Sequence, residues 1–307
     1  MFLNVKNRKK KLRRTSASQT WIICFIFLLF LIACQPEKPS EKPSYEEQAI
    51  SENLVTASSD VKKSSMVAIK ERGVLRVGTA ITDPFEYYDP KSGELIGFDV
   101  DLMNRIAEDL NVRIEWTEMS FAGLLPSVQD RKVDVAIAAI YINPDREAEV
   151  DFSEPYIYTG LVMIVRPDLV SSVKSVEDLP GLRVGVKIGA TGSVLAQDLF
   201  VRGTRFEVID YRDTLSSLLD LEVGRVDVVF NDYLNTLAYI KDAKSDLKIV
   251  TKMDGEVYFL SNVGLGIAVH EGEYELLSFI NQTLDRMRMK GELDCLSEKW
   301  INPAIKD

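Results

Sequence analysis

Apolar positions from residue 74 onward alternate between two spacings. Residues 98–110 carry an apolar side chain at about every fourth position, which places a single apolar stripe along an amphipathic helix. Residues 74–78 and 133–140 are instead apolar nearly throughout, as expected of strands that are covered on both faces. Strands of this kind that alternate with helices predict an α/β fold built on parallel sheets.

The same patterns divide the chain into two similar sets of elements. Strands are expected at 74–78, 112–119, 133–140, 182–187, 206–210, 226–230, 247–251 and 263–269, and helices at 98–110, 121–129, 191–200, 214–223, 231–241, 272–290 and 292–299. In each set, an amphipathic helix leads through basic residues into a Val-Asp-Val strand, at 133–135 and at 226–228. This repetition predicts two similar α/β lobes.

The second set is complete before the last two helices begin, so we expect the chain to return to the first lobe. Lobe 1 is then formed by residues 69–162 and 257–307, and lobe 2 by residues 163–256. Two linked crossings between lobes form a hinge.

The first 33 residues are typical of an export signal. They contain seven basic and no acidic residues and end in an apolar run of 13 residues, Trp21 to Ala33. A membrane span needs about 20 apolar residues, so this run suits the core of a signal peptide. Leu31-Ile32-Ala33-Cys34 resembles a bacterial lipobox, which implies that Cys34 is lipidated and becomes the N-terminus. An ordinary signal peptide or a short anchor is the alternative.

Composition then changes sharply. Residues 34–68 are rich in Ser, Glu and Lys, which predicts a flexible tether after the lipidated cysteine. Although the whole chain has a formal charge of −10, residues 34–307 hold 30 basic and 47 acidic residues. Such a surface repels phosphate groups, so we expect no nucleic-acid partner and no peripheral binding to anionic lipid.

Few residues are available for metal or nucleophilic chemistry. Once the leader and Cys34 are set aside, Cys295 is the single remaining thiol, and the helical pattern around it favours a buried structural role. His270 is the single histidine and is expected at the surface, so neither a His-based triad nor a multi-His metal site can be assembled. We therefore expect no catalytic residue, metal or cofactor.

Several short motifs follow one another along residues 70–303. These motifs are Pro84-Phe85-Glu86, Gly97-Phe98-Asp99-Val100-Asp101-Leu102, Asn143-Pro144-Asp145-Arg146, Asp151-Phe152-Ser153-Glu154-Pro155-Tyr156, Gly185-Val186-Lys187 and Asp227 through Asp232. Through them the chain resembles the bacterial extracellular solute-binding proteins of family three, the polar-amino-acid type. Each motif is weak alone, but the ordered set is specific. The resemblance implies a two-lobed, periplasmic-binding-protein-like fold of type II, with a two-crossing hinge, that closes over a small ligand.

Charged residues at strand ends supply the expected grip on that ligand. In open α/β sheets ligands bind beyond the carboxyl ends of strands, where Arg146 offers a fork of donors that matches a carboxylate. The resemblance implies that Arg146 holds the α-carboxylate of an amino acid and that Asp232 holds its α-amino group. The alternatives are a surface ion pair of Arg146 with Asp145 or Glu149, and capping of the following helix by Asp232.

A turn between a strand and a helix is the expected second site for the carboxylate. The turn contains Gly189 and Thr191, and a helix N-terminus suits an anion. The resemblance implies that Thr191 helps to hold the carboxylate, although Thr191 could instead cap the helix. Phe121 is expected to stack on the ligand, with a place in the core as the alternative.

Other expected binding residues depart from the family pattern or lie beside a departure. Tyr141 stands where the family often has Ser or Thr, while the backbone carbonyl of Ala139 can still accept from an ammonium group. Phe85 ends the segment Thr79–Phe85, which is one residue shorter than in the family. This segment also lacks the aromatic residue that the family often has before Pro84-Phe85. Lys187 would pair with a polar or acidic ligand side chain, or be solvated. These departures leave the identity of the ligand open.

The function implied by the resemblance is binding of an amino acid or similar zwitterion outside the cytoplasm and its delivery to the permease subunits of an ABC importer. The protein would be exported and lipid-anchored, in the periplasm or at the outer face of the cell membrane. One alternative is a dehydratase-type enzyme on the same fold, of the cyclohexadienyl or arogenate kind, for which Glu86 is the acidic residue nearest the cleft. The other is a ligand-sensing receptor subunit.

Overall fold

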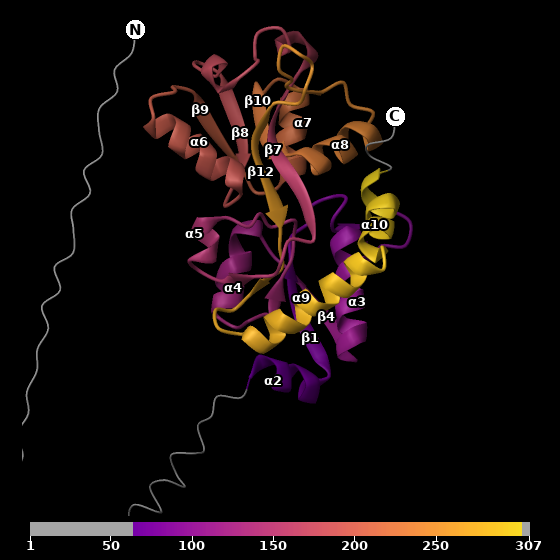
Figure 1. Ribbon diagram of the computed structural model, residues 1–307. Helices are drawn as coiled ribbons and strands as arrows, with labels where there is room; N and C mark the ends of the chain where they lie inside the picture. The colour runs from indigo at the N-terminus through magenta and orange to yellow at the C-terminus, as the bar shows by residue number, and fades with distance from the viewer. Residues whose placement is uncertain (1–63, 303–307) are drawn as a thin grey trace, which may run out of the picture. The chain divides into compact units, whose positions relative to one another are not determined.

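The computed structural model describes residues 64–302, in which two α/β lobes each surround a sheet of their own (Figure 1). The expected signal peptide, Cys34 and residues 35–63 of the tether lie outside the described residues. Helix α2 (Ser65–Arg72) includes residues 65–68, which the sequence pattern assigned to the tether. Ser64 caps this helix and Ile69 is fully buried, so residues 65–68 belong to the first lobe and not to the tether.

The first lobe contains a five-stranded sheet in the order β4-β1-β5-β13-β6. Its strands are β1 (Val74–Thr79), β4 (Arg113–Glu118), β5 (Val135–Ala136), β6 (Asp151–Phe152) and β13 (Ala268–Val269). Besides α2, its helices include α3 (Phe98–Leu110), α4 (Leu124–Gln129) and α9 (Tyr274–Met289). β1 pairs in parallel with β4 and β5, whereas β13 is antiparallel to both of its neighbours. Because β13 and α9 come from the end of the chain, the chain returns to this lobe.

The second lobe contains a sheet in the order β11-β7-β10-β8-β9, to which β12 is added on β7. The strands are β7 (Ile157–Val165), β8 (Arg183–Lys187), β9 (Glu207–Tyr211), β10 (Val228–Asp232), β11 (Lys248–Ile249) and β12 (Phe259–Leu265). The helices that cover it are α6 (Thr191–Val201), α7 (Thr214–Glu222) and α8 (Tyr233–Asp242). β9, β8 and β10 are parallel, as expected for strands linked by helices.

Two antiparallel strands connect the lobes. β7 and β12 pair from Ile157 opposite Leu265 to Val162 opposite Phe259, and both extend from the second lobe toward the first (Figure 1). The expected boundary between the lobes, after residue 162, lies inside β7, which is one continuous strand. The crossings are therefore one paired ribbon, and the two-lobed type II fold is confirmed.

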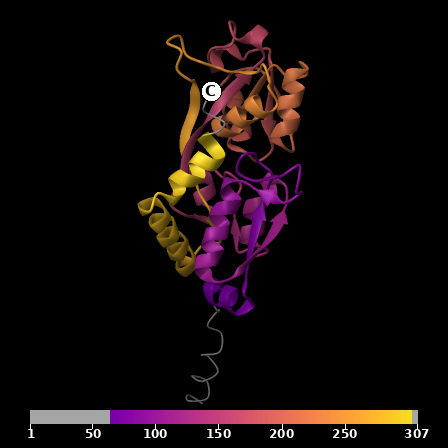
Figure 2. The same ribbon diagram turned by 90° about the vertical axis from the view of Figure 1, so that its right-hand side faces the viewer.

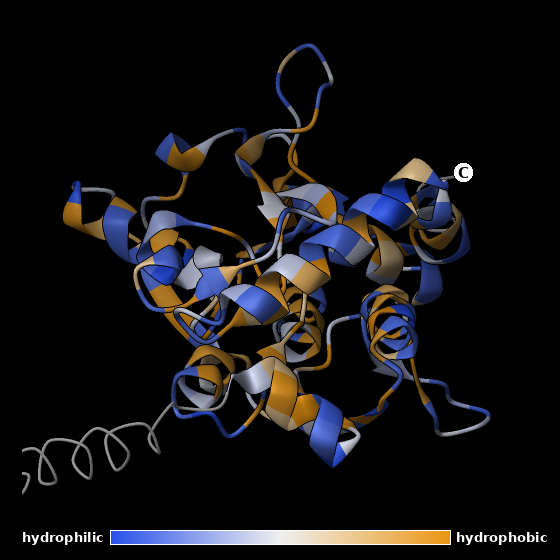
Figure 3. Ribbon diagram, turned by 60° about the horizontal axis from the view of Figure 1, so that its bottom comes forward, coloured by the Kyte–Doolittle hydropathy of each residue, from blue (hydrophilic) through white to orange (hydrophobic). Residues whose placement is uncertain are grey.

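The terminal helices cover the first lobe. α9 packs against α2 and α3, and α10 (Glu292–Leu296) follows it along the same lobe (Figure 2). The helices show hydrophobic and hydrophilic residues side by side, as amphipathic helices do (Figure 3). Cys295 is exposed, so the expectation of a buried thiol was wrong. In α10 it is Leu293 that is buried, and a residue two positions further on points to the other side of a helix.

One expected strand is much shorter than its apolar pattern suggests. The pattern of residues 133–140 predicted a strand of that length, but β5 contains only Val135 and Ala136. Ala139 has a φ of 49°, which turns the chain away from an extended path. Residues 137–140 are nonetheless buried, so their apolar pattern reflects burial and not strand length.

Gly97 fixes the start of α3 against the Pro84-Phe85 turn. Its φ is 137°, and a Cβ atom there would lie 2.2 Å from the carbonyl oxygen of Phe85. That carbonyl accepts a hydrogen bond from the N–H of Asp99 at 2.9 Å, so backbone would have to move to make room. A side chain at this position is therefore excluded by both conformation and space.

We expect Gly97→Ala to lower the free energy of unfolding by at least about 2 kcal/mol, through strain and a backbone clash. The matched control is Gly93→Ala, because Gly93 also has a positive φ but has nothing within 4 Å of its added Cβ. That control should cost about 1 kcal/mol. Urea unfolding of both variants gives the comparison, and equal losses would contradict the steric argument.

Candidate functional site

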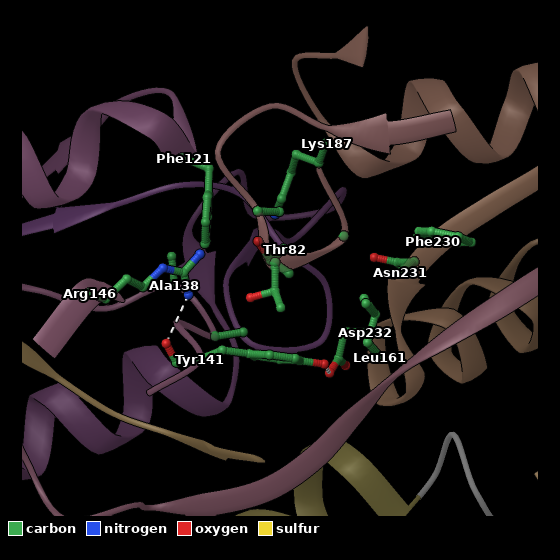
Figure 4. A pocket seen from close by; sticks show the side chains of 14 residues that line it. Thr82, Phe121, Ala138, Tyr141, Arg146, Leu161, Lys187, Phe230, Asn231 and Asp232 are labelled. Carbon is green, nitrogen blue, oxygen red and sulfur yellow. Dashed lines mark hydrogen bonds between the residues drawn. The ribbon is translucent and has the colours of Figure 1, made fainter. Parts of the chain in front are cut away.

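A cavity of about 440 Å³ lies between the two lobes, at the carboxyl ends of β5, β8 and β10 (Figure 4). It is lined by Thr82, Phe121, Ala138, Ala139, Tyr141, Arg146, Leu161, Lys187, Ala190, Thr191, Gly192, Phe230, Asn231 and Asp232. Seven of the nine expected binding residues are in this lining; the exceptions are Gly189 and Phe85. Residues from distant parts of the sequence thus meet at one place, as the strand-end rule predicts.

Arg146 is held from both lobes. It lies in α5 (Pro144–Glu147), a single helical turn whose N-cap, Asn143, accepts a hydrogen bond from the backbone N–H of Arg146. Its Nη1 donates to the carbonyl of Tyr141 at 2.8 Å, and its Nη2 donates to the carbonyl of Gly189, in the second lobe, at 3.1 Å. Gly189 therefore contacts the arginine through its backbone while bordering a neighbouring cavity.

Arg146 is only 9% exposed, and burial lowers the pKa of its guanidinium to about 10. It forms no ion pair with any carboxylate in residues 64–302, so the expected alternatives, Asp145 and Glu149, do not pair with it. Arginine remains protonated at neutral pH even with this pKa. A buried positive charge without a paired anion is therefore directed at the cavity.

Asp232 lies at the end of β10 and is also the N-cap of α8. Its Oδ1 accepts the backbone N–H of Asn235 at 3.0 Å, so the capping role is observed. Its Oδ2 accepts hydroxyl hydrogens from Tyr141 at 2.7 Å and from Thr159 at 2.8 Å. Burial raises the pKa of this carboxyl, while these hydrogen bonds lower it. Asp232 is thus fixed in place and faces the same cavity as Arg146.

Thr191 and Lys187 contribute from the second lobe. Thr191 is the first residue of α6, whose N-cap is Ala190, so Thr191 does not cap the helix. Its Oγ1 is buried and has no hydrogen-bond partner among the described residues. Lys187, at the end of β8, places Nζ 4.2 Å from the ring centroid of Phe121 (Figure 4). Burial lowers its pKa to about 8, so it is mostly protonated at neutral pH.

Phe85 does not line the cavity. It is fully buried in the first lobe, with its ring 6.3 Å from that of Phe98 in an edge-to-face arrangement. The backbone of Phe85 is tied to the start of α3, and this directs the ring into the core. Other lining residues were not expected. Phe230 and Asn231 directly precede Asp232 in the sequence, so they could have been predicted to line the cavity. The sequence around Thr82 and Leu161 gave no indication that these two residues line it.

Two carboxyl groups are buried behind the cavity wall. Glu86 and Asp99 are both 0% exposed. Asp99 Oδ2 accepts the N–H of Ala139 at 2.9 Å and the hydroxyl of Tyr156 at 3.0 Å. Burial raises the pKa of Asp99 to about 6, and burial together with Asp99 raises the pKa of Glu86 well above its usual value. The pair therefore holds a proton near neutral pH, and Glu86 has no exposed surface from which to act on a ligand.

We expect wild-type stability to fall as pH rises above about 4.5, because native Glu86 keeps a proton that the unfolded chain releases. Glu86→Gln keeps the shape of the side chain but removes the carboxyl group that binds the proton. The melting temperature of this variant should therefore fall less between about pH 5 and pH 8 than that of the wild type. Melting curves across this range measure the difference. Glu94→Gln, at an exposed position, is the control. Parallel curves for wild type and Glu86→Gln would contradict the shared proton.

Metal-binding groups and membrane-spanning helices were sought in the part of the chain that the structure describes. No group of three or more His, Cys, Asp or Glu side chains within residues 64–302 is placed to hold a metal ion. Over the same residues, no helix has the length and apolar character needed to cross a membrane.

The chain is similar in sequence and in structure to known binding proteins. Residues 75–303 match the model of the bacterial extracellular solute-binding proteins, family 3. The L-cystine-binding protein TcyJ of Escherichia coli K12 is 32% identical over 238 residues, which cover 77% of this chain and 86% of that protein. A mutant of ArgBP from T. maritima has 36% identity and a TM-score of 0.71, covering 77% of this chain and 99% of that one. An ancestral amino acid-binding protein, AncCDT-1, described as a precursor of cyclohexadienyl dehydratase, has 31% identity and a TM-score of 0.70, covering 78% and 100%.

Proposed function

Because the chain belongs to the bacterial extracellular solute-binding proteins, family 3, we propose that the cavity between its lobes holds the two charged ends of a free amino acid or similar zwitterion. The protein is a solute-binding component of an ABC importer and not an enzyme, in keeping with relatives that are named as binding proteins. The acid considered for a dehydratase alternative, Glu86, is sealed from the cavity.

The buried guanidinium of Arg146 carries this proposal. It has no anionic partner in the described part of the chain, although a charge in such a place is costly without one. Two of its donors are used by carbonyl groups, and a guanidinium has five. The remaining donors are available to the α-carboxylate of a ligand. Thr191 Oγ1, buried and unpaired, adds a donor, and Lys187 adds positive charge.

The opposite side of the cavity suits an ammonium group. Asp232 supplies the negative charge, and the backbone carbonyl of Ala139 and the hydroxyl of Tyr141 supply further acceptors. Tyr141 already donates to Asp232 across the lobes, so a ligand ammonium would join an existing hydrogen-bonded pair. Phe121, beneath the two cations, offers an aromatic face to the rest of the ligand.

Closure of the lobes over the ligand is favoured by contacts from both sides. Arg146 bonds to Gly189 and Tyr141 bonds to Asp232, and each of these hydrogen bonds joins one lobe to the other. A ligand that touches Arg146 and Asp232 together binds better when the lobes are closed, so its binding shifts the protein to that state. The permease subunits of the importer would then receive the closed form.

Arg146→Ala should weaken binding of the amino acid at least about 30-fold, because loss of one partner from a buried charge pair costs about 2 kcal/mol or more. The ligand is first identified by a thermal-shift screen of the common amino acids, and Kd is then measured by calorimetry. Arg202→Ala, at the exposed C-cap residue that follows α6, is the control and should bind like the wild type. An unchanged Kd in Arg146→Ala would refute the clamp.

We propose further that the exported protein is anchored by a lipid on Cys34. The proposal rests on the lipobox-like sequence and the basic and apolar stretches before it. Cys34→Ser should move the protein from the membrane fraction to the soluble fraction of the cell, as judged by immunoblotting. Cys295→Ser, at an exposed thiol outside this motif, should remain in the membrane fraction. Membrane retention of Cys34→Ser would contradict the anchor.

A further inference from the structure

The carboxylate of Asp232 is already satisfied by donors from the chain itself. A carboxylate offers about four lone-pair positions on its two oxygens. Oδ2 accepts two hydroxyl groups, from Tyr141 at 2.7 Å and from Thr159 at 2.8 Å. Oδ1 accepts the backbone N–H of Asn235 at 3.0 Å, and the backbone N–H of Leu234 also donates to this carboxylate. The negative charge of Asp232 is therefore surrounded by the protein's own hydrogen bonds.

The hydroxyl of Tyr141 keeps acceptor capacity beside that charge. A hydroxyl has one hydrogen to donate and two lone pairs with which to accept. Tyr141 donates its hydrogen to Asp232 and lines the cavity, so its Oη can still accept from a ligand. Thr159 also donates to Asp232 but is not part of the cavity lining. Of the two hydroxyl groups on Asp232, the one that a ligand in the cavity can reach is thus that of Tyr141.

Tyr141 also connects the two charged residues of the clamp. Its backbone carbonyl accepts a hydrogen bond from Arg146 at 2.8 Å, its hydroxyl donates to Asp232, and its ring extends between them (Figure 4). The residue is only 5% exposed, so packing holds the ring in this position. The Ser or Thr that the family often has here carries its hydroxyl next to the backbone, whereas the tyrosine ring carries it across to Asp232.

We propose that Asp232 acts on the ligand chiefly through Tyr141, whose hydroxyl donates to the carboxylate and accepts from the ammonium group of the amino acid. Donation to a charged partner polarises a hydroxyl and makes its oxygen a stronger acceptor. The hydroxyl comes from the first lobe and the carboxylate from the second, so this relay is complete only when the lobes are closed. The inference rests on the proposed zwitterion clamp and names the atom that receives the amino group.

Removal of single hydroxyl groups tests the relay. The twenty common L-amino acids are the probes, and the one that gives the largest thermal shift with the wild type is used for calorimetry. Tyr141→Phe keeps the buried ring and loses only the hydroxyl. Its Kd for that amino acid should rise at least about ten-fold, as expected when a hydrogen bond to a charged group is lost.

Thr159→Val is the matched control on the same carboxylate oxygen. Both substitutions remove one donor from Asp232 Oδ2 and free one of its lone pairs, but Thr159→Val leaves the Tyr141 hydroxyl in the cavity. Its Kd should therefore stay within about three-fold of the wild-type value. Tyr211→Phe is a second control and should bind like the wild type, because it removes a hydroxyl–carboxylate bond, to Asp220, that lies inside the second lobe.

A crystal structure of the wild type with the same amino acid gives a measurement that does not depend on the folding of any variant. The relay requires the ligand nitrogen to lie within about 3.2 Å of Tyr141 Oη. A nitrogen more than about 3.5 Å from Oη, an unchanged Kd in Tyr141→Phe, or equal losses in Tyr141→Phe and Thr159→Val would overturn the relay while leaving the clamp intact. If none of the twenty amino acids binds, the clamp fails together with the relay.

Discussion

Two opposite charges, each buried on a different lobe and both facing one cavity, are the constraint on which the rest of this structure depends. Arg146 and Asp232 are each 9% exposed, and each is hydrogen-bonded to a group from the other lobe. Charges in such a place are costly to desolvate unless they are well paired. The lobes therefore provide acceptors for the guanidinium and donors for the carboxylate, and they leave room for a ligand that pairs with both.

The fold supplies the rigidity that this arrangement needs. The parallel strands end at the cleft, so the residues that follow them are placed by backbone pairing and not by long loops. The paired crossings β7 and β12 join the lobes through a ribbon that can bend without separating them. Gly97 and the Glu86–Asp99 pair fix the wall behind the cavity, because Asp99 holds the N–H of Ala139. The site thus depends on buried groups that never touch the ligand.

Electrostatics divide the space between the lobes into regions of different sign. Arg146 and Lys187 make one side of the cavity positive, whereas Asp232 makes the opposite side negative. A ligand that bridges these regions would be selected by its charge pattern along its length and by its size. Specificity of this kind comes from groups left unpaired when the wrong ligand binds, which is more discriminating than apolar contact.

The sequence by itself determined the α/β class, the two lobes, the family and half of the cavity lining, because apolar spacing and short ordered motifs are local features that survive without a structure. Only the tertiary structure showed that Phe85 faces the core, that β5 stops after two residues and that Cys295 is exposed. It alone brought Thr82 and Leu161 into the cavity lining. These features depend on which side chains meet across elements distant in sequence, and no local pattern encodes such meetings.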